Sequence, residues 1–307
     1  MGKYILRRLL QMIPVIIGST FLIYSLNFAL PGNPVEGRCG ERPCPPNYVA
    51  AFNKEYNLDK PLLVQYGLYM GKVVRGDLGK TFYGNSVAHE LGVRWPTTIR
   101  LALMAIVVEI IIGISAGVLA GIRRGKFIDS LVTVSTLVLI SIPVFVIGNL
   151  VQLVFGVRLG WFPVTAIHAT FRELVMPAFV LASLSVAYVA RLMRTNLVEN
   201  MRADYVRTAR AKGLSNARTV GVHTLRNSLI PVITYIGIDL GALMGGAIVT
   251  ERIFNVNGVG NFLYRSINQK DGVAVVGTIT VLVLVFLLAN LLVDILYGVL
   301  DPRISND

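Results

Sequence analysis

The sequence predicts an all-α membrane protein that crosses the bilayer six times. Apolar residues make up 54% of the chain and charged residues only 15%, whereas a soluble protein of this length needs more charge on its surface. Six apolar stretches come close to the ~20 residues that a spanning helix requires. Basic residues gather in alternate connecting segments, as expected when one side of a membrane retains them.

The six expected spans differ in length, and the fourth is the shortest. Lys3 and Arg8 precede the first stretch, as in a secretory signal, but this stretch is too long for a signal core and no small-x-small cleavage motif follows Leu30. We therefore expect an uncleaved first span. The expected spans are Leu9–Leu30, Thr98–Ile122, Leu131–Phe155, Leu174–Val189, Leu229–Val249 and Val275–Val299.

The orientation follows from the lysines and arginines. With a cytoplasmic N-terminus, the inner segments carry 15 of them and the two short outer loops carry five. The loop Pro31–Pro96 is left out, because loops beyond ~60 residues translocate largely regardless of charge. Both termini are therefore expected in the cytoplasm. Basic residues retained on the cytoplasmic side explain the net charge of +12, so nucleic acid is not expected as a partner.

The first outer loop contains both cysteines of the chain, Cys39 and Cys44. An extracytoplasmic loop is an oxidising setting, so a small disulfide is expected there, with two unpaired thiols as the alternative. A metal site is not expected, because no histidine or further cysteine lies nearby. Further along, Tyr48–Tyr56 and Pro61–Val74 form amphipathic helices that either lie on the membrane surface or pack on the rest of the chain.

Two spans carry glycines at four-residue spacing, which lets helix backbones approach closely in lipid. They are Gly113, Gly117 and Gly121 in the second span and Gly237, Gly241 and Gly245 in the fifth.

No segment of the sequence provides all the features that a site for catalysis or nucleotide binding requires. Gly79-Lys80-Thr81 resembles the end of a phosphate-binding loop, but Val74 occupies the position of the required first glycine, and the segment is expected outside the cell. No metal-binding cluster of cysteine and histidine is present in the sequence. We therefore expect no catalytic residue, no metal and no cofactor in this chain.

The segment Arg191–Arg226 connects two spans on the expected cytoplasmic side. Apolar and small residues at three- and four-residue steps predict a helix over Glu199–Lys212. Gly213 breaks it, Ser215 or Asn216 caps a short second helix, and Pro231 opens the next span.

These residues carry a resemblance to a known family. Tyr205–Leu214 followed by His223–Asn227 resembles the coupling loop of bacterial ATP-binding-cassette (ABC) importers, and more narrowly that of dipeptide/oligopeptide permeases. The general importer pattern has a Glu-Ala-Ala run before the glycine, where this chain has Arg207–Ala209. That departure is typical of the peptide branch. Further matches are Tyr4–Leu9, Leu30–Pro34, Gly76–Gly79, Gly245–Glu251, Ile253–Phe254, Gly258–Gly260, Asn290–Asp294 and Asp301–Arg303.

The resemblance implies a type I ABC importer permease fold in the bacterial inner membrane. Residues 1–31 would form the N-terminal span, 32–96 an extracytoplasmic loop domain, 97–300 a five-helix core with a cytoplasmic coupling loop at 191–228, and 301–307 a cytoplasmic tail. The residues implied to contact the ATPase are Arg207, Thr208, Ala209, Arg210, Ala211, Lys212, Gly213 and Leu214.

The implied complex also contains a second, homologous permease subunit, two cytoplasmic ATPase subunits or domains, and an extracytoplasmic substrate-binding protein. ATP and Mg²⁺ would be bound by the ATPases, so this chain is not itself an enzyme. The implied cargo is di- and oligopeptides. Relatives that carry nickel chelates, glutathione or haem leave those cargoes open, and a secondary transporter is a further alternative, although no inverted repeat is visible.

Among the polar residues within the spans, Glu109 and Asp239 are the deepest carboxylates. Ionisable groups at membrane depth are costly and mark candidate functional sites. They are expected either to line the translocation path, or to pair with arginines of the second permease, or to be satisfied by neighbouring hydroxyl and backbone groups.

Overall fold

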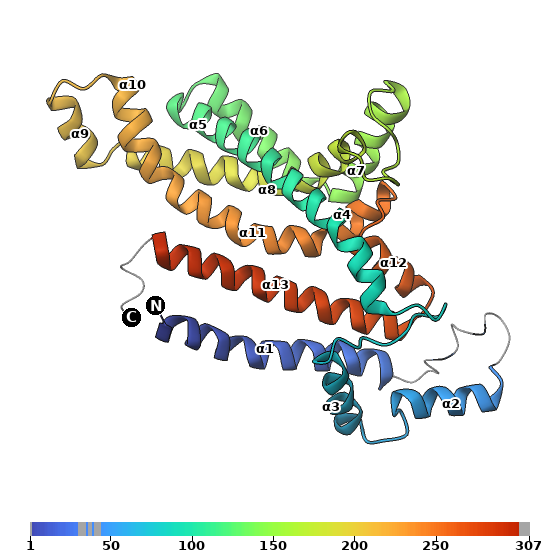
Figure 1. Ribbon diagram of the computed structural model, residues 1–307. Coiled ribbons are helices and arrows are strands. Elements are labelled where there is room, and N and C mark those ends of the chain that lie inside the picture. The colour runs from blue at the N-terminus through green and yellow to red at the C-terminus, as the bar shows by residue number, and fades with distance from the viewer. Residues whose placement is uncertain (1, 30–34, 36–38, 40–43, 301–307) are drawn as a thin grey trace. The chain divides into compact units, whose positions relative to one another are not determined.

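The computed structural model describes residues 2–29, 35, 39 and 44–300, and Figure 1 shows how the helices follow one another. The turn expected at Leu30–Pro34 and the tail expected at 301–307 lie outside the described residues. Every regular element within the described ranges is a helix. The chain forms two compact units, Met1–Thr98 with Asn257–Asp307, and Ile99–Val256.

The first unit pairs the two ends of the chain. Helix α1 (Gly2–Phe28) packs along α13 (Gly272–Leu300), and α12 (Val259–Asn268) also packs on α13. The outer loop contributes α2 (Pro46–Tyr56) and α3 (Leu62–Val73), as predicted. Each begins directly after a proline whose φ suits a helix start, and Phe52 of α2 packs in one core cluster with Val273 of α13.

The second unit is organised around one long helix, α8 (Phe171–Asn200). Packed against α8 are the π-helical segment η2 (Glu109–Ile114), α5 (Ser115–Ile122), α6 (Phe127–Ser141), α7 (Val144–Val151) and α11 (Leu225–Ile253). Helix α4 (Val87–Val108) leads into η2, and η3 (Gln152–Arg158) follows α7.

The glycine stripe of the second expected span packs directly on α8. A Cβ atom on Gly117 would lie 2.5 Å from the carbonyl oxygen of Ala190, and one on Gly113 would lie 2.7 Å from Val189 Cγ1. The predicted close packing is therefore confirmed for this stripe. In the other stripe, Gly245 meets no described atom within 4 Å, so packing within this chain does not require a glycine there.

Among the residues that the structure describes, five helices are long and apolar enough to cross a membrane, and a sixth candidate is a bent pair of helices. The pair is Phe127–Ser141 with Val144–Arg158, which meet at 103°. The all-α prediction is confirmed, and the count of six holds when the pair is taken as one span. The expectation of one continuous helix over Leu131–Phe155 is wrong. Pro143 supplies no N–H, and the preceding Ile142 is extended, with φ −96° and ψ 125°.

The fourth expected span, Leu174–Val189, is too short. The helix starts at Phe171 because Thr170 and Glu173 form a capping box, in which the Glu173 N–H donates to Thr170 Oγ1 at 3.4 Å and the Thr170 N–H donates to the Glu173 carboxylate. It ends at Asn200, well beyond the apolar stretch.

Candidate functional site

In the connection between the long helices α8 and α11, the first element is a short separate helix, α9 (Asp204–Ala211). The expected continuous helix over Glu199–Lys212 is wrong, because residues 201–203 form a turn and Ala203 is extended, with φ −67° and ψ 152°. α8 therefore ends before α9 begins, and α9 takes its own direction (Figure 1).

Gly213 ends α9, as predicted. Its φ is +79°, a left-handed value that glycine adopts without steric cost. The Gly213 N–H donates to the Arg210 carbonyl at 2.9 Å, and the Leu214 N–H donates to the Ala209 carbonyl at 3.2 Å. These two bonds form a Schellman motif, which satisfies the last carbonyl groups of the helix.

The helix after Gly213 is longer than predicted. Ser215 caps it by accepting the Arg218 N–H at 3.4 Å, so Ser215 rather than Asn216 is the cap. α10 (Asn216–Arg218), the π-helical segment η4 (Thr219–Thr224) and α11 then follow without a break. The expected short second helix ending before Pro231 is wrong, since Pro231 lies inside α11. Residues 201–215 therefore form the whole connection between α8 and the continuous helix that runs from Asn216 to Ile253.

The eight residues expected to contact the ATPase differ in their exposure to solvent. Ala209 is buried together with Val206, and the helix packs on η4, so Ala209 holds α9 in place instead of presenting a contact surface. Leu214 is half-buried. The exposed candidates are Arg207, Thr208, Arg210, Ala211, Lys212 and Gly213. We call these six residues the α9 surface.

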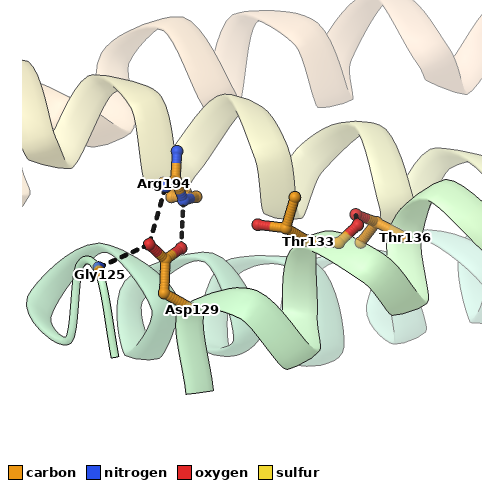
Figure 2. A network of polar contacts seen from close by, with 5 residues as sticks. All are labelled: Gly125, Asp129, Thr133, Thr136 and Arg194. Atoms are coloured by element: carbon orange, nitrogen blue, oxygen red, sulfur yellow. Dashed lines mark hydrogen bonds and ion pairs between the residues drawn. The ribbon is translucent and has the colours of Figure 1, made fainter. Parts of the chain in front are cut away.

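An ion pair that the sequence did not reveal joins α6 to α8 near the start of this connection (Figure 2). Both nitrogens Nε and Nη2 of Arg194 donate to the carboxylate of Asp129, the latter at 2.8 Å. The Gly125 N–H donates to the same carboxylate at 2.9 Å. The side chain of Asp129 is 7% exposed and that of Arg194 is 31% exposed. Figure 2 places Thr133 and Thr136 further along α6, away from the pair.

The two intramembrane carboxylates lie in the same unit. Glu109 opens η2, is 0% exposed, and neither of its carboxylate oxygens has a hydrogen-bond partner among the described residues. On α11, the Oδ2 atom of Asp239 is buried without a hydrogen-bond partner among the described residues. Glu109 and Asp239 belong to two segments, η2 and α11, that each pack on α8.

In the outer loop, a disulfide joins Cys39 to Cys44, with Cα atoms 5.3 Å apart. Within the described ranges, no group of three or more histidine, cysteine or acidic residues is arranged to hold a metal ion.

Comparison with known proteins covers the whole chain. Residues 113–306 match the family described as binding-protein-dependent transport system inner membrane component, and residues 1–102 match the N-terminal part of such membrane components. A dipeptide transport system permease protein (DppB) of Alkalihalophilus pseudofirmus is 35% identical over 99% of this chain and 100% of its own length.

Two further relatives differ in the cargo that they are named for. A di/tripeptide transport system permease protein (DppB) of Pseudomonas aeruginosa is 38% identical over 100% of this chain and 99% of its own length. A glutathione transport system permease protein (GsiC) of Escherichia coli is 34% identical over 99% of each chain.

Proposed function

The chain belongs to the family of binding-protein-dependent transport system inner membrane components, and on that premise we propose that it is the membrane permease subunit of an ATP-driven importer of di- and oligopeptides. The family and the five or six apolar helices make it a multi-pass membrane protein. The relatives named for dipeptides and di/tripeptides cover essentially the full chain, which supports peptides as the cargo.

The observation that carries the proposal is the α9 surface. A short helix ended by a left-handed glycine projects from the two longest helices of its unit and exposes Arg207, Arg210 and Lys212. Basic groups on such a projecting helix complement an acidic surface on an ATPase. This charge complementarity steers docking and fixes the register of the contact. The only described ion pair within α9, between Arg207 and Asp204 at 3.6 Å, is highly exposed and contributes little, so these charges remain available to a partner.

The remaining parts of the importer follow from this assignment. A second, homologous permease completes the membrane channel, two ATPase subunits or domains bind ATP and Mg²⁺, and an extracytoplasmic protein delivers the cargo. The chain itself then needs no cofactor and catalyses no reaction. The distribution of lysine and arginine supports cytoplasmic N- and C-termini in a bacterial inner membrane, and this places α9 on the ATPase side and the disulfide loop on the outer side.

Reconstitution tests the function directly. The permease pair, the ATPases and the binding protein are placed in proteoliposomes, and uptake of radiolabelled dialanine is measured with and without ATP. Uptake should require ATP. Accumulation on an ion gradient without the ATPases would instead identify a secondary transporter. ATP-dependent uptake of glutathione but not of dialanine would reassign the cargo, in line with the glutathione relative.

The variant Gly213→Val tests the role of the α9 surface. At a φ of +79° a β-branched residue costs about 1–2 kcal/mol, so the turn that ends α9 should distort. We expect normal capture of dialanine by the binding protein but loss of transport-coupled ATP hydrolysis. Gly84→Val is the matched control, because Gly84 has a φ of +82°, also meets nothing within 4 Å, and lies in the outer loop. Coupled ATPase activity that is equal in both variants would contradict the assignment.

A further inference from the structure

The first unit contains a cavity between its two longest helices that the proposed coupling mechanism does not use. α1 packs along α13, and the cavity that their side chains leave has a volume of about 200 Å³. On α1 the lining residues are three or four positions apart, so they share one face of the helix. They are Arg8, Gln11, Met12 and Val15.

The α13 wall of the cavity is formed by Leu287, Asn290 and Leu291. Their level relative to α1 follows from a contact at the other end of the pair, where a Cβ atom on Gly272 would lie 3.1 Å from Asn27 Oδ1. The two helices run antiparallel, and each residue advances about 1.5 Å along its axis. Counting away from that contact along both helices brings Arg8 level with residues 290 and 291.

The lining changes from polar to apolar along the two helices. Arg8 directly precedes the apolar stretch of α1, whereas Val15 lies seven residues further into it, which is about 10 Å along the axis. Asn290 and Gln11 lie at levels near Arg8, and Leu291 is the apolar exception there. The deeper lining is apolar and includes Met12 and Leu287.

This gradient matches the chemistry of a phospholipid. A guanidinium carries a permanent positive charge and binds phosphate with bidentate hydrogen bonds. Basic pockets between membrane helices bind anionic lipid headgroups. An inorganic anion would leave the apolar wall at Met12 and Val15 without a partner, and an acidic protein surface would place polar groups against it. A phospholipid covers both parts, because its acyl chains begin a few ångströms below its phosphate.

Asn290 adds a second sign that the cavity takes a ligand. Its Oδ1 atom is buried and has no hydrogen-bond partner among the described residues, and a buried oxygen without a donor is destabilising. The last torsion of an asparagine side chain has a broad minimum, so the amide can turn its oxygen to a donor that enters the cavity. The glycerol headgroup of phosphatidylglycerol carries hydroxyl donors beyond its phosphate, whereas the choline headgroup carries none.

We propose that this cavity binds an anionic phospholipid with a hydroxylated headgroup, of the phosphatidylglycerol type. Arg8 donates to the phosphate, and its five N–H groups allow this beside contacts within the chain. The Asn290 oxygen accepts a hydrogen bond from a headgroup hydroxyl, and Met12 and Val15 contact the upper part of an acyl chain. The lipid touches both α1 and α13 and thereby stabilises their pairing. Its binding does not depend on the proposed cargo.

Photolabelling tests the lipid site in the intact membrane complex. The chain with its native partner subunits is placed in phosphatidylcholine nanodiscs that contain a small fraction of phosphatidylglycerol with a diazirine near the top of one acyl chain. After illumination, labelled peptides are identified by mass spectrometry. The segment Met12–Val15 should be labelled at least roughly tenfold more by this lipid than by phosphatidylcholine with the same diazirine chain. Equal labelling by the two lipids would overturn the proposal without any variant.

Inorganic phosphate distinguishes a lipid headgroup from a free anion. Added at millimolar concentration, it should leave the labelling by phosphatidylglycerol unchanged, because it gains nothing from the apolar wall. Loss of the labelling would instead identify a site for free phosphate and reject the lipid.

Arg8→Gln tests the contact with the phosphate, and Arg7→Gln is its matched control. Arg7 is exposed and does not line the cavity, since neighbouring residues of a helix point about 100° apart. Both variants lose one positive charge, so any general attraction of anionic lipid to the start of α1 falls equally. Labelling of Met12–Val15 should fall roughly tenfold more in Arg8→Gln than in Arg7→Gln. Equal losses would show that the charge acts at the membrane surface and that the cavity binds no headgroup.

Asn290→Leu tests the contact with the headgroup hydroxyl. Phosphatidylmethanol has the same charge as phosphatidylglycerol but no hydroxyl, so it should compete with the photoreactive lipid roughly two- to tenfold less well than unlabelled phosphatidylglycerol does. In Asn290→Leu this difference between the two competitors should disappear. Equal competition in the unsubstituted chain, or a difference that persists in the variant, would overturn the role of Asn290.

Discussion

Replacing Asp129 by asparagine should weaken the junction between α6 and α8 by about 2 kcal/mol. The substitution keeps the size of the side chain but removes the charge that accepts two N–H groups of Arg194 and one of Gly125. Hydrogen bonds to charged groups are worth about 1.5–3 kcal/mol, and breaking a fully buried ion pair costs about 3–5 kcal/mol. Since the Arg194 side chain is 31% exposed, water can solvate the remaining cation, so the lower range applies.

A double-mutant cycle measures this interaction. Asp129→Asn, Arg194→Gln and the double variant are unfolded at equilibrium in mixed micelles, and the interaction energy is the departure from additivity. We expect about 2 kcal/mol, equivalent to roughly a 30-fold change in the unfolding equilibrium. The exposed pair Asp204 and Arg207 is the control cycle, with an expected value below about 1 kcal/mol.

The same variants report on coupling. Arg194 lies six residues before the end of α8, so its bond to Asp129 fixes the helix that leads to α9. Under the proposed function, the ATPases would move α9 during the transport cycle. Asp129→Asn should then increase the ATP hydrolysed per dialanine transported, because this movement would be transmitted less completely from α8 to α6. An interaction energy near zero, or one no larger than that of the control pair, would refute the reasoning.

Four further substitutions, one of them a control, have outcomes set by the structure. Gly117→Val should lower the free energy of unfolding by about 1–3 kcal/mol through overpacking against α8, whereas Gly245→Val, in open space, should be near neutral in the same measurement. Cys44→Ser should remove a cross-link worth about 2 kcal/mol by loop-closure entropy, seen as faster proteolysis of the outer loop but unchanged protection of the spans. Thr170→Ala should cost about 1 kcal/mol by loss of a helix cap, detected as faster amide exchange in the first turn of α8.

Hydropathy predicted the number of spans and missed the shape of one of them. The length of an apolar stretch reports burial in lipid, so Leu131–Phe155 qualified as a single span. Hydropathy contains no information on backbone hydrogen bonding, however. Pro143 interrupts the helix in that stretch, and its two parts meet at 103°. The proline was visible in the sequence, and its effect on Ile142 is a general one, so this error was avoidable.

The site was predicted unevenly for a physical reason. Gly213 was identifiable because a glycine after a periodic segment is a local signal that requires only neighbouring residues. The ion pair of Asp129 and Arg194 joins residues 65 positions apart, and no local pattern specifies such a partner. Glu109 and Asp239 fall between these cases. The cost of a charge in the membrane singled them out in the sequence, whereas the burial of their oxygens without a described hydrogen-bond partner is visible only in the structure.

α8 is the element through which these separate features act on one another. Within its 30 residues it presents the surface that receives Gly113 and Gly117 and the guanidinium of Arg194, and it ends where the turn to α9 begins. A helix held both by close glycine contacts and by an ion pair resists a shift at one point alone, because packed interiors resist local deformation. Under the proposed function, a pull on α9 therefore acts on the ion pair of Arg194 with Asp129 and on the glycine contacts of α8 together, rather than on α9 alone.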